Sequence, residues 1–337
     1  MSRPETSEGP LAIAAGAGIH RVSLPTPFLV GRVNLYLVDD EPLTLFDTGP
    51  NSGTALDELE QALAARGVAI EDLGLIVLTH QHMDHVGLLE VLARRSGAEI
   101  AAFAPLQRWL ADYDASATGD DEYAQAVMRR HGVPEDLVAV LGVVAAAFRP
   151  FGSSGAVTRP LLDGDRLELR DRSFEVRHRP GHSPSDMVFW DGEKRILIGG
   201  DHLLAHISSN PVVHRPLSGD TGGPRPTPLI DYIASLRATA ELPAEIVLGG
   251  HGEPVVDPRE LIDERLRLHE RRARKILGML RREPLTAHQV AVEMWGNVAV
   301  TQAFLTVSEV LGHLDLLLSE GRVEELDDGT VSRFAAS

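Results

Sequence analysis

Cysteine is absent from the 337 residues of this sequence. A thiol nucleophile and thiolate metal ligands are therefore excluded, and histidine nitrogen and carboxylate oxygen are left as the natural metal ligands. The absence of cysteine also fits a reducing compartment, so we expect a cytoplasmic location.

Positive charge is also scarce. The chain has 32 lysine and arginine residues against 49 aspartate and glutamate residues, which gives a formal net charge of −17. Non-specific binding of nucleic acid depends on lysine and arginine contacts to phosphate, so this balance argues against a phosphate-backbone partner and against anionic membranes. We expect a small-molecule substrate and no DNA or membrane partner, and we leave association into a homo-oligomer open.

Long apolar runs are missing as well. No segment approaches the ~18–20 apolar residues that a membrane-spanning helix needs, and Met1–Pro10 lacks the basic start of a signal peptide. We expect residues 1–18 to be a flexible N-terminus. The hydrophobic content of 43% is enough for a sizeable core, and the length exceeds that of one small domain.

A dense group of metal-binding side chains follows the apolar run Leu73–Leu78. The next seven residues, from Thr79 to His85, read Thr-His-Gln-His-Met-Asp-His. The apolar run predicts a buried strand, and the H-x-H-x-D-H motif would deliver four candidate ligands from one tight loop at its end. Imidazole nitrogen and carboxylate oxygen suit zinc and similar divalent ions.

Three further candidate ligands occur downstream. His182, Asp201 and His251 each stand directly after a strand-like segment and one or two glycines. Glycine lets the backbone approach an ion closely and adopt unusual φ values. Because one loop cannot surround two ions, we expect these three positions to complete the site.

With these motifs the chain resembles the metallo-β-lactamase superfamily over roughly residues 20–257. The early segment Phe46-Asp47-Thr48-Gly49 also matches the family's strand-end Asp-x-Gly. The resemblance implies an α/β fold for residues 19–258, a four-layer αββα sandwich with two sheets between helices. Helical spacing at Thr54–Arg66 and His85–Ser96 agrees with this order.

Carried over to this sequence, the resemblance assigns the metal ligands. They form two groups of three and one bridging residue: His80, His82 and His182 for a first ion, Asp84, His85 and His251 for a second, and Asp201 for both. Asp47 would orient a ligand from outside, the support that metal-bound imidazoles need. The implied cofactors are two zinc ions, with iron or manganese as alternatives.

The ligand set predicts a hydrolase. Two ions ~3.5–4 Å apart can share a bridging hydroxide, and Asp84 is expected to act catalytically by orienting it and moving a proton. We expect the substrate to be a thioester, an ester or a lactone. The same site can run a phosphodiesterase or single-strand endoribonuclease reaction, which stays open as the alternative although the net charge counts against it.

Three other interpretations are weaker. The absence of cysteine excludes the cysteine-ligand β-lactamases of the family. A related branch oxidises persulfides with one iron and needs no full second set of ligands, whereas this chain has one. The same complete set disfavours a non-enzymatic metal-binding regulator.

Residues 104–150 interrupt the alternation of strands and helices, with a polar link at Ala115–Gly119. The predicted helices are Pro105–Tyr113, Asp121–His131 and the very apolar Glu135–Phe148. This helical insert is either a packing or dimer-contact element or a lid over the site. As a lid, it would line an acyl or aromatic pocket with Trp109 and Tyr113.

The stretch after Asp201 is the other candidate for substrate contacts. Ser208, Ser209 and Asn210 could donate hydrogen bonds to a substrate oxyanion or phosphate. An ordinary loop is equally compatible with this composition.

Residues 259–337 predict a linker helix and a separate C-terminal domain. Helices at Pro258–Arg282, Thr286–Trp295 and Thr301–Glu320 precede a hairpin signal at Asp327-Asp328-Gly329. This order is that of a winged helix, and it resembles the tail of family members of the lactamase-like protein 2 and glyoxalase II-like branch.

Charge decides how we interpret this tail. Residues 283–337 carry nine acidic residues and two arginines. A DNA-reading domain needs cations that neutralise phosphate. We therefore expect the helix at Thr301–Glu320 to pack on the catalytic body or on a second subunit.

Overall fold

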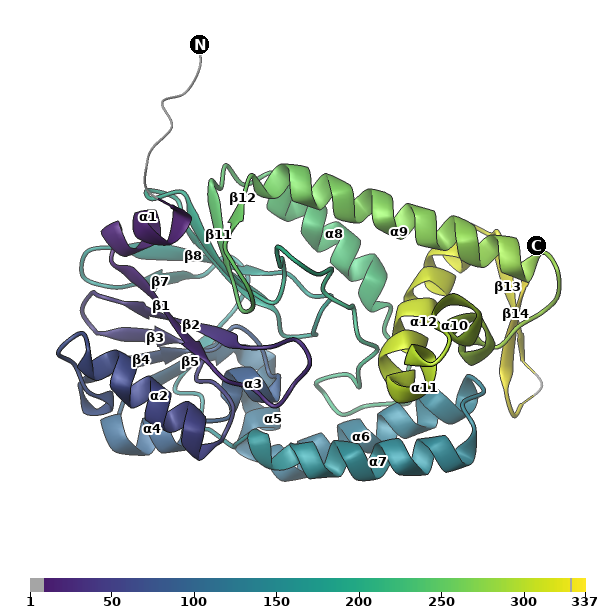
Figure 1. Cartoon of the computed structure of the whole chain (residues 1–337), viewed down its shortest axis with the longest axis horizontal. Helices are drawn as coiled ribbons and strands as arrows, with labels where there is room; N and C mark the ends of the chain where they lie inside the picture. Colours follow the sequence, from purple (N-terminus) through teal and green to yellow (C-terminus); the bar gives the residue numbers. More distant parts are fainter. Residues whose placement is uncertain (1–8, 328) are drawn as a thin grey trace, which may run out of the picture.

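The computed structural model describes residues 9–327 and 329–337. Two six-stranded sheets lie face to face in one part of the molecule, and a helical tail with a two-stranded hairpin forms the other part (Figure 1). The helical insert runs along one edge between these two parts, as Figure 1 shows.

The first sheet contains its strands in chain order. They are β1 Ile19–Leu24, β2 Val33–Val38, β3 Thr44–Phe46, β4 Leu75–Val77, β5 Glu99–Phe103 and β6 Arg159–Leu161. The strands from β3 to β6 run parallel. Since parallel strands end at the same edge, the residues that follow β3 and β4 emerge together, and these are Asp47 and the H-x-H-x-D-H loop.

The second sheet has the order β12-β11-β10-β9-β8-β7. Its strands are β7 Arg166–Glu168, β8 Ser173–His178, β9 Met187–Asp191, β10 Ile196–Gly200, β11 Ile246–Gly249 and β12 Val255–Val256. Strands β10 and β11 are parallel neighbours. Asp201 follows β10 directly and His251 follows β11 after Gly250, so both leave the sheet at one edge.

Apolar side chains fill three layers around the sheets. Phe46 of the first sheet meets Phe174 and Phe189 of the second at ring-centroid distances of 5.4 and 5.0 Å. Helices α2 Gly53–Ala64 and α4 Leu89–Ser96 cover the outer face of the first sheet. Helices α8 Pro228–Ala240 and α9 Pro258–Leu280 cover the second. The predicted order of helix, sheet, sheet and helix is therefore observed.

The helix predicted over His85–Ser96 is two helices, α3 Met83–Val86 and α4. Gly87 lies at the break. A Cβ atom there would lie 2.2 Å from the backbone nitrogen of Asn51 and from the backbone oxygen of Phe151. The helix is thus interrupted where other segments approach its backbone, a contact that helical spacing does not reveal.

The insert consists of α5 Gln107–Ala111, α6 Tyr113–Arg130 and α7 Glu135–Phe148. The prediction for Glu135–Phe148 is confirmed, whereas the predicted polar link at Ala115–Gly119 is wrong because these residues lie inside α6. Arg215 donates to the backbone oxygen of Ser116 at 3.1 Å and to Asp120 at 2.8 Å. Contact with a distant arginine stabilises a segment that its composition marks as a weak helix former.

The N-terminus is more ordered than expected from residue 10 onward. Helix α1 spans Pro10–Gly16, and the side chain of Ala14 is buried against the inter-sheet core. The expectation of a flexible segment therefore fails for this part because an apolar side chain anchors it. Residues 1–8 lie outside the described residues.

The tail contains the predicted sequence of two helices and a hairpin. Its elements are α10 Ala287–Trp295, the short α11 Val298–Thr301, α12 Ala303–Ser319, β13 Val323–Asp327 and β14 Ser332–Ala336. Helix α12 packs on α8 and α9, which confirms the expected contact with the catalytic body. Val127 and Met128 of α6 share a core with this tail. The insert therefore braces the tail against the body.

Within residues 9–327 and 329–337, no helix combines the length and the apolar character needed to cross a membrane.

Candidate metal centre

Seven predicted ligands converge from four loops at the edges of the two sheets. They are His80, His82, Asp84 and His85 after β4, His182 between β8 and β9, Asp201 after β10, and His251 after β11. The structure brings all seven together, although up to 171 positions separate them along the chain.

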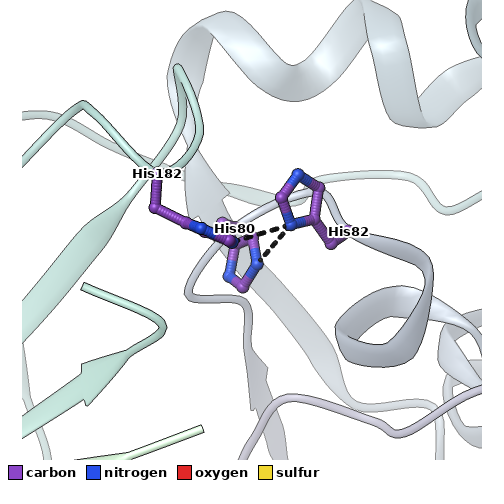
Figure 2. A group of neighbouring side chains, drawn as sticks. All are labelled: His80, His82 and His182. Carbon is purple, nitrogen blue, oxygen red and sulfur yellow. Dashed lines mark hydrogen bonds between the residues drawn. The ribbon is translucent and has the colours of Figure 1, made fainter. Parts of the chain in front are cut away.

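The first group consists of His80, His82 and His182 (Figure 2). Nδ1 of His82 lies 3.0 Å from Nε2 of His80 and 2.9 Å from Nε2 of His182. Two ligands of a tetrahedral zinc ion, each ~2.0–2.1 Å from it, are about 3.3 Å apart. The three ring nitrogens are therefore spaced closely enough to share one cation.

The second group consists of Asp84, His85 and His251. Nε2 of His251 lies 3.3 Å from Oδ2 of Asp84, and Nε2 of His85 lies 4.0 Å from Oδ1 of the same carboxylate. All three residues are buried. This group offers two nitrogens and one oxygen, again a donor set suited to a zinc-class ion.

Asp201 lies between the two groups. Its Oδ2 is 3.6 Å from Nε2 of His182 and 3.4 Å from Nε2 of His251, while Oδ1 is 3.5 Å from Nε2 of His85. One carboxylate thus faces a histidine of the first group and two of the second. This is the position that a bridging ligand needs.

Buried atoms without hydrogen bonds test whether these residues fit metal ions. Among the described residues, Nε2 of His85, Nε2 of His251 and Oδ1 of Asp201 are buried and have no hydrogen-bond partner. A buried polar atom left unpaired costs roughly 1–3 kcal/mol. Coordination to a cation satisfies all three atoms at once, so the donor set fits a divalent metal.

The electrostatics of the site also favour a cation. Burial, helped by the nearby His182, lowers the pKa of His82 to about 3, so this imidazole offers a neutral lone pair. Burial alone would also lower the pKa of His85, but Asp47, Asp201 and Asp84 outweigh it and raise the pKa to about 9. The carboxylates therefore demand positive charge beside them.

Asp47 supports one histidine of each group. Its Oδ2 lies 2.8 Å from Nδ1 of His85 and accepts the Thr79 hydroxyl at 2.8 Å, and its Oδ1 accepts the Thr79 backbone N–H. The Thr79 oxygen lies 3.0 Å from Nδ1 of His80. Since the Thr79 hydroxyl donates its hydrogen bond to Asp47, its oxygen accepts a hydrogen bond from the Nδ1–H of His80. Both histidines are left with Nε2 as the metal-binding atom.

Sequence reasoning missed Thr79 in this role, and it also missed Asn34 and Tyr36. Thr79 directly precedes the motif, and its role becomes clear only from its hydrogen bonds to Asp47, which is distant in the sequence. Asn34 and Tyr36 are polar side chains within the otherwise apolar and fully buried strand β2. A buried polar side chain needs a hydrogen-bond partner. The presence of two polar residues in an apolar strand could therefore have indicated contacts with another segment.

Two of the three predicted substrate residues after Asp201 donate hydrogen bonds to backbone oxygens. The Ser209 hydroxyl donates to the backbone oxygen of Asp201, and Nδ2 of Asn210 donates to the backbone oxygen of Leu305 at 3.0 Å. The Ser208 hydroxyl is buried without a hydrogen-bond partner among the described residues. Among the same residues, Oδ1 of Asn210 is likewise buried without a partner, so Ser208 and Asn210 each retain one uncommitted side-chain oxygen.

Trp109 and Tyr113 pack in the core beside the first sheet. The indole N–H of Trp109 donates to Asp120 at 2.8 Å, and the Tyr113 hydroxyl donates to the backbone oxygen of Arg149 at 2.9 Å. Both polar atoms are therefore occupied inside the protein. This arrangement favours the packing interpretation of the insert over the lid.

His269, Glu309 and His313 form another buried group, between α9 and α12. Glu309 accepts a hydrogen bond from Arg272 at 2.5 Å, and Nδ1 of His313 donates to the backbone oxygen of Glu309 at 2.7 Å. The carboxylate is thus already paired with a cation. We interpret this group as a polar network that joins the tail to the long helix.

Comparisons with known proteins agree with this architecture. Residues 29–251 match the family described as the Metallo-beta-lactamase superfamily. The Probable metallo-hydrolase YqjP of Bacillus subtilis (strain 168) is 34% identical over 313 residues, which cover 93% of this chain and 96% of that protein. The human Acyl-coenzyme A thioesterase MBLAC2 is 28% identical over 193 residues, 50% of this chain and 58% of that protein.

A solved structure shows the same similarity. The crystal structure of a metallo-beta-lactamase family protein from Thermus thermophilus has a TM-score of 0.78 at 27% identity, covering 95% of this chain and 99% of that one. The chain therefore belongs to the metallo-beta-lactamase superfamily. Within that family it is an enzyme, a metal-dependent hydrolase.

Proposed function

We propose that this enzyme hydrolyses a thioester, an ester or a lactone at a centre of two metal ions, with zinc as the first candidate and iron or manganese as alternatives. The observation that carries the proposal is the pairing of two three-residue groups around Asp201. Two donor groups joined by one carboxylate suit two ions at close range.

The chain's own residues divide the work. Bound ions would lower the pKa of a coordinated water toward ~7 and polarise the oxygen of the substrate. Asp84 is buried beside His251. Its carboxylate would accept a hydrogen bond from the attacking water and so direct a lone pair of the water oxygen toward the acyl carbon. It would then transfer the proton taken from this water to the leaving group. Asp47 and Thr79 would keep His85 and His80 in the tautomers that present Nε2.

The substrate class rests on two supports. A human relative is named an acyl-coenzyme A thioesterase. The net charge of −17 disfavours an RNA backbone as substrate. No contact in the described residues favours the phosphodiesterase alternative.

We propose that the winged-helix-like tail serves packing in a cytoplasmic enzyme and reads no DNA. Four polar residues in the middle of α12 that a reading helix would present are buried: Ser308 is 0%, Glu309 7%, His313 0% and Asp315 6% exposed. They cannot contact base edges without unpacking the helix. Duplex-DNA binding by the full chain at physiological salt would contradict this proposal.

A substrate screen tests the main proposal. Purified protein reconstituted with zinc should hydrolyse members of an acyl-coenzyme A or lactone series, and this activity should disappear after chelation and return on metal addition. Bis-p-nitrophenyl phosphate serves as the matched phosphodiester probe. Turnover of the phosphodiester with no turnover of any acyl substrate would overturn the assignment.

A further inference from the structure

The turn that carries His251 is held by the beginning of strand β2. Nδ1 of His251 lies 2.8 Å from the backbone oxygen of Arg32, and an isolated bridge pairs Val33 with His251. Strand β2 belongs to the first sheet, whereas His251 follows a strand of the second sheet. The contact therefore joins the two sheets at the metal centre.

Asn34 makes three hydrogen bonds with this turn. Its side-chain Nδ2 donates to the backbone oxygen of Gly249 at 3.1 Å and to that of Gly252 at 2.8 Å. Its backbone N–H donates to the oxygen of Gly250 at 2.7 Å. Asn34 is 3% exposed. The two N–H groups of one carboxamide thus donate to backbone carbonyls on either side of His251.

Tyr36 adds a second contact from the same strand. Its hydroxyl donates to the backbone oxygen of Gly249 at 2.7 Å. Burial raises the pKa of this phenol well above its usual range, so the hydroxyl stays protonated as a donor. The oxygen of Gly249 therefore receives two side-chain hydrogen bonds.

The turn needs such support because glycine alone cannot fix it. A Cβ atom on Gly250 would lie 2.3 Å from Oδ1 of Asp201 and 2.8 Å from Cε1 of His85. The position therefore requires glycine, which has the greatest backbone freedom of any residue. Since glycine leaves the backbone many accessible conformations, hydrogen bonds from other groups must fix the turn that carries the metal-binding nitrogen of His251.

We propose that Asn34 is the positioning residue for the second metal ion, and that Tyr36 assists it. Asn34 fixes the carbonyls of Gly249 and Gly252 and thereby sets where Nε2 of His251 points. This inference rests on the proposed dinuclear centre. His80, His82 and His182 do not contact Asn34 through any of these bonds, so the effect of Asn34 is confined to the second group.

Replacement of Asn34 by aspartate tests the inference with almost no change in shape. The variant Asn34→Asp loses both donated hydrogen bonds and places oxygen against two carbonyl oxygens. Outer partners of metal ligands are worth about 10–100-fold in metal affinity. We expect one of the two zinc equivalents to lose affinity by that factor while the other is unchanged, measured by competition with a series of zinc chelators.

Matched variants separate positioning from general destabilisation. Asn297→Asp changes an exposed asparagine in the tail and should leave both zinc affinities unchanged. Tyr36→Phe removes one hydroxyl and should lower the affinity of the same zinc equivalent severalfold. This variant provides the test if Asn34→Asp does not fold. Tyr113→Phe, which loses a hydroxyl outside the centre, is its control.

The outcomes distinguish this inference from the proposed function. If the wild-type protein binds two zinc ions and Asn34→Asp and Tyr36→Phe bind both as tightly, the positioning role is wrong and the dinuclear hydrolase stands. An equal loss of both affinities would also overturn the inference, because it would mean general damage. A wild-type protein that binds a single ion would contradict the proposed function itself.

Discussion

Asp47 and His85 are joined by a contact of 2.8 Å between Oδ2 of the carboxylate and Nδ1 of the imidazole, although 38 positions separate them. Asp47 has a φ of 62°, in the left-handed region that non-glycine residues seldom adopt. This conformation at the end of β3 directs the carboxylate toward the metal loop, where it also accepts hydrogen bonds from the backbone N–H and the hydroxyl of Thr79.

The first prediction concerns this carboxylate. Asp47→Asn tolerates the left-handed backbone, because asparagine is among the residues found there, but it removes the charge that orients His85. We expect metal affinity to fall by about 10–100-fold, measured by chelator competition. Asp257→Asn is the control, since Asp257 has a φ of 56° and caps α9. Equal affinity in the two variants would show that Asp47 does not orient the ligands.

The second prediction concerns proton transfer. Asp84→Asn keeps the shape of the side chain but removes its ability to accept a proton. We expect kcat to fall by about 10²-fold or more, because general bases contribute roughly 10²–10⁴-fold. Asp57→Asn, an exposed change on α2, should leave kcat unaltered. Near-normal turnover in metal-loaded Asp84→Asn would remove Asp84 from the mechanism.

The third prediction tests whether the helical insert is a lid over the site or a packing element. Trp109 is 7% exposed and bonded to Asp120. Trp109→Ala should therefore lower the free energy of unfolding by about 3–5 kcal/mol, measured by chemical denaturation. It should leave relative kcat/KM values unchanged across a series of acyl chain lengths. A shift in chain-length preference with normal stability would restore the lid interpretation.

The fourth prediction concerns the junction between the tail and the body. Arg225 donates two hydrogen bonds to Asp315 on α12, at 2.6 and 3.1 Å, and Asp315 is buried whereas the arginine side chain is 23% exposed. Removing one partner of a fully buried pair costs ~3–5 kcal/mol, so with partial solvent screening we expect a loss of roughly 2 kcal/mol for Asp315→Asn.

An exposed pair of the tail provides the control for this variant. Glu320 accepts from Arg322 at 2.8 Å, and both side chains are more than two-fifths exposed. Glu320→Gln should change the free energy of unfolding by no more than about 1 kcal/mol. Similar values for Glu320→Gln and Asp315→Asn would mean that the junction does not depend on the Arg225–Asp315 pair.

Much of the centre was predictable because its candidate ligands occur in short, recognisable sequence patterns. The H-x-H-x-D-H motif directly follows an apolar strand, and a glycine directly precedes each of His182, Asp201 and His251. The family resemblance grouped them, and the structure places the members of each group within reach of one another. The ligand roles themselves stay predictions until metal is measured.

The supporting contacts were not predictable because they join residues far apart in the chain. Asn34 donates hydrogen bonds to backbone carbonyls more than 200 positions away. Arg215, from a distant loop, donates a hydrogen bond to Asp120 on α6. Periodicity describes one segment at a time and contains no information on such partners. The same limit explains why Ala115–Gly119 was predicted as a link although it is helical.

The central claim is that these seven side chains hold two metal ions. Elemental analysis of the purified, zinc-reconstituted protein tests it most directly, with His182→Ala and His251→Ala measured beside the wild-type chain. We predict about two zinc ions per wild-type chain and about one in each variant, because each loses a ligand from a different group. No retained transition metal in the wild-type chain, or an unchanged metal content in both variants, would contradict the account.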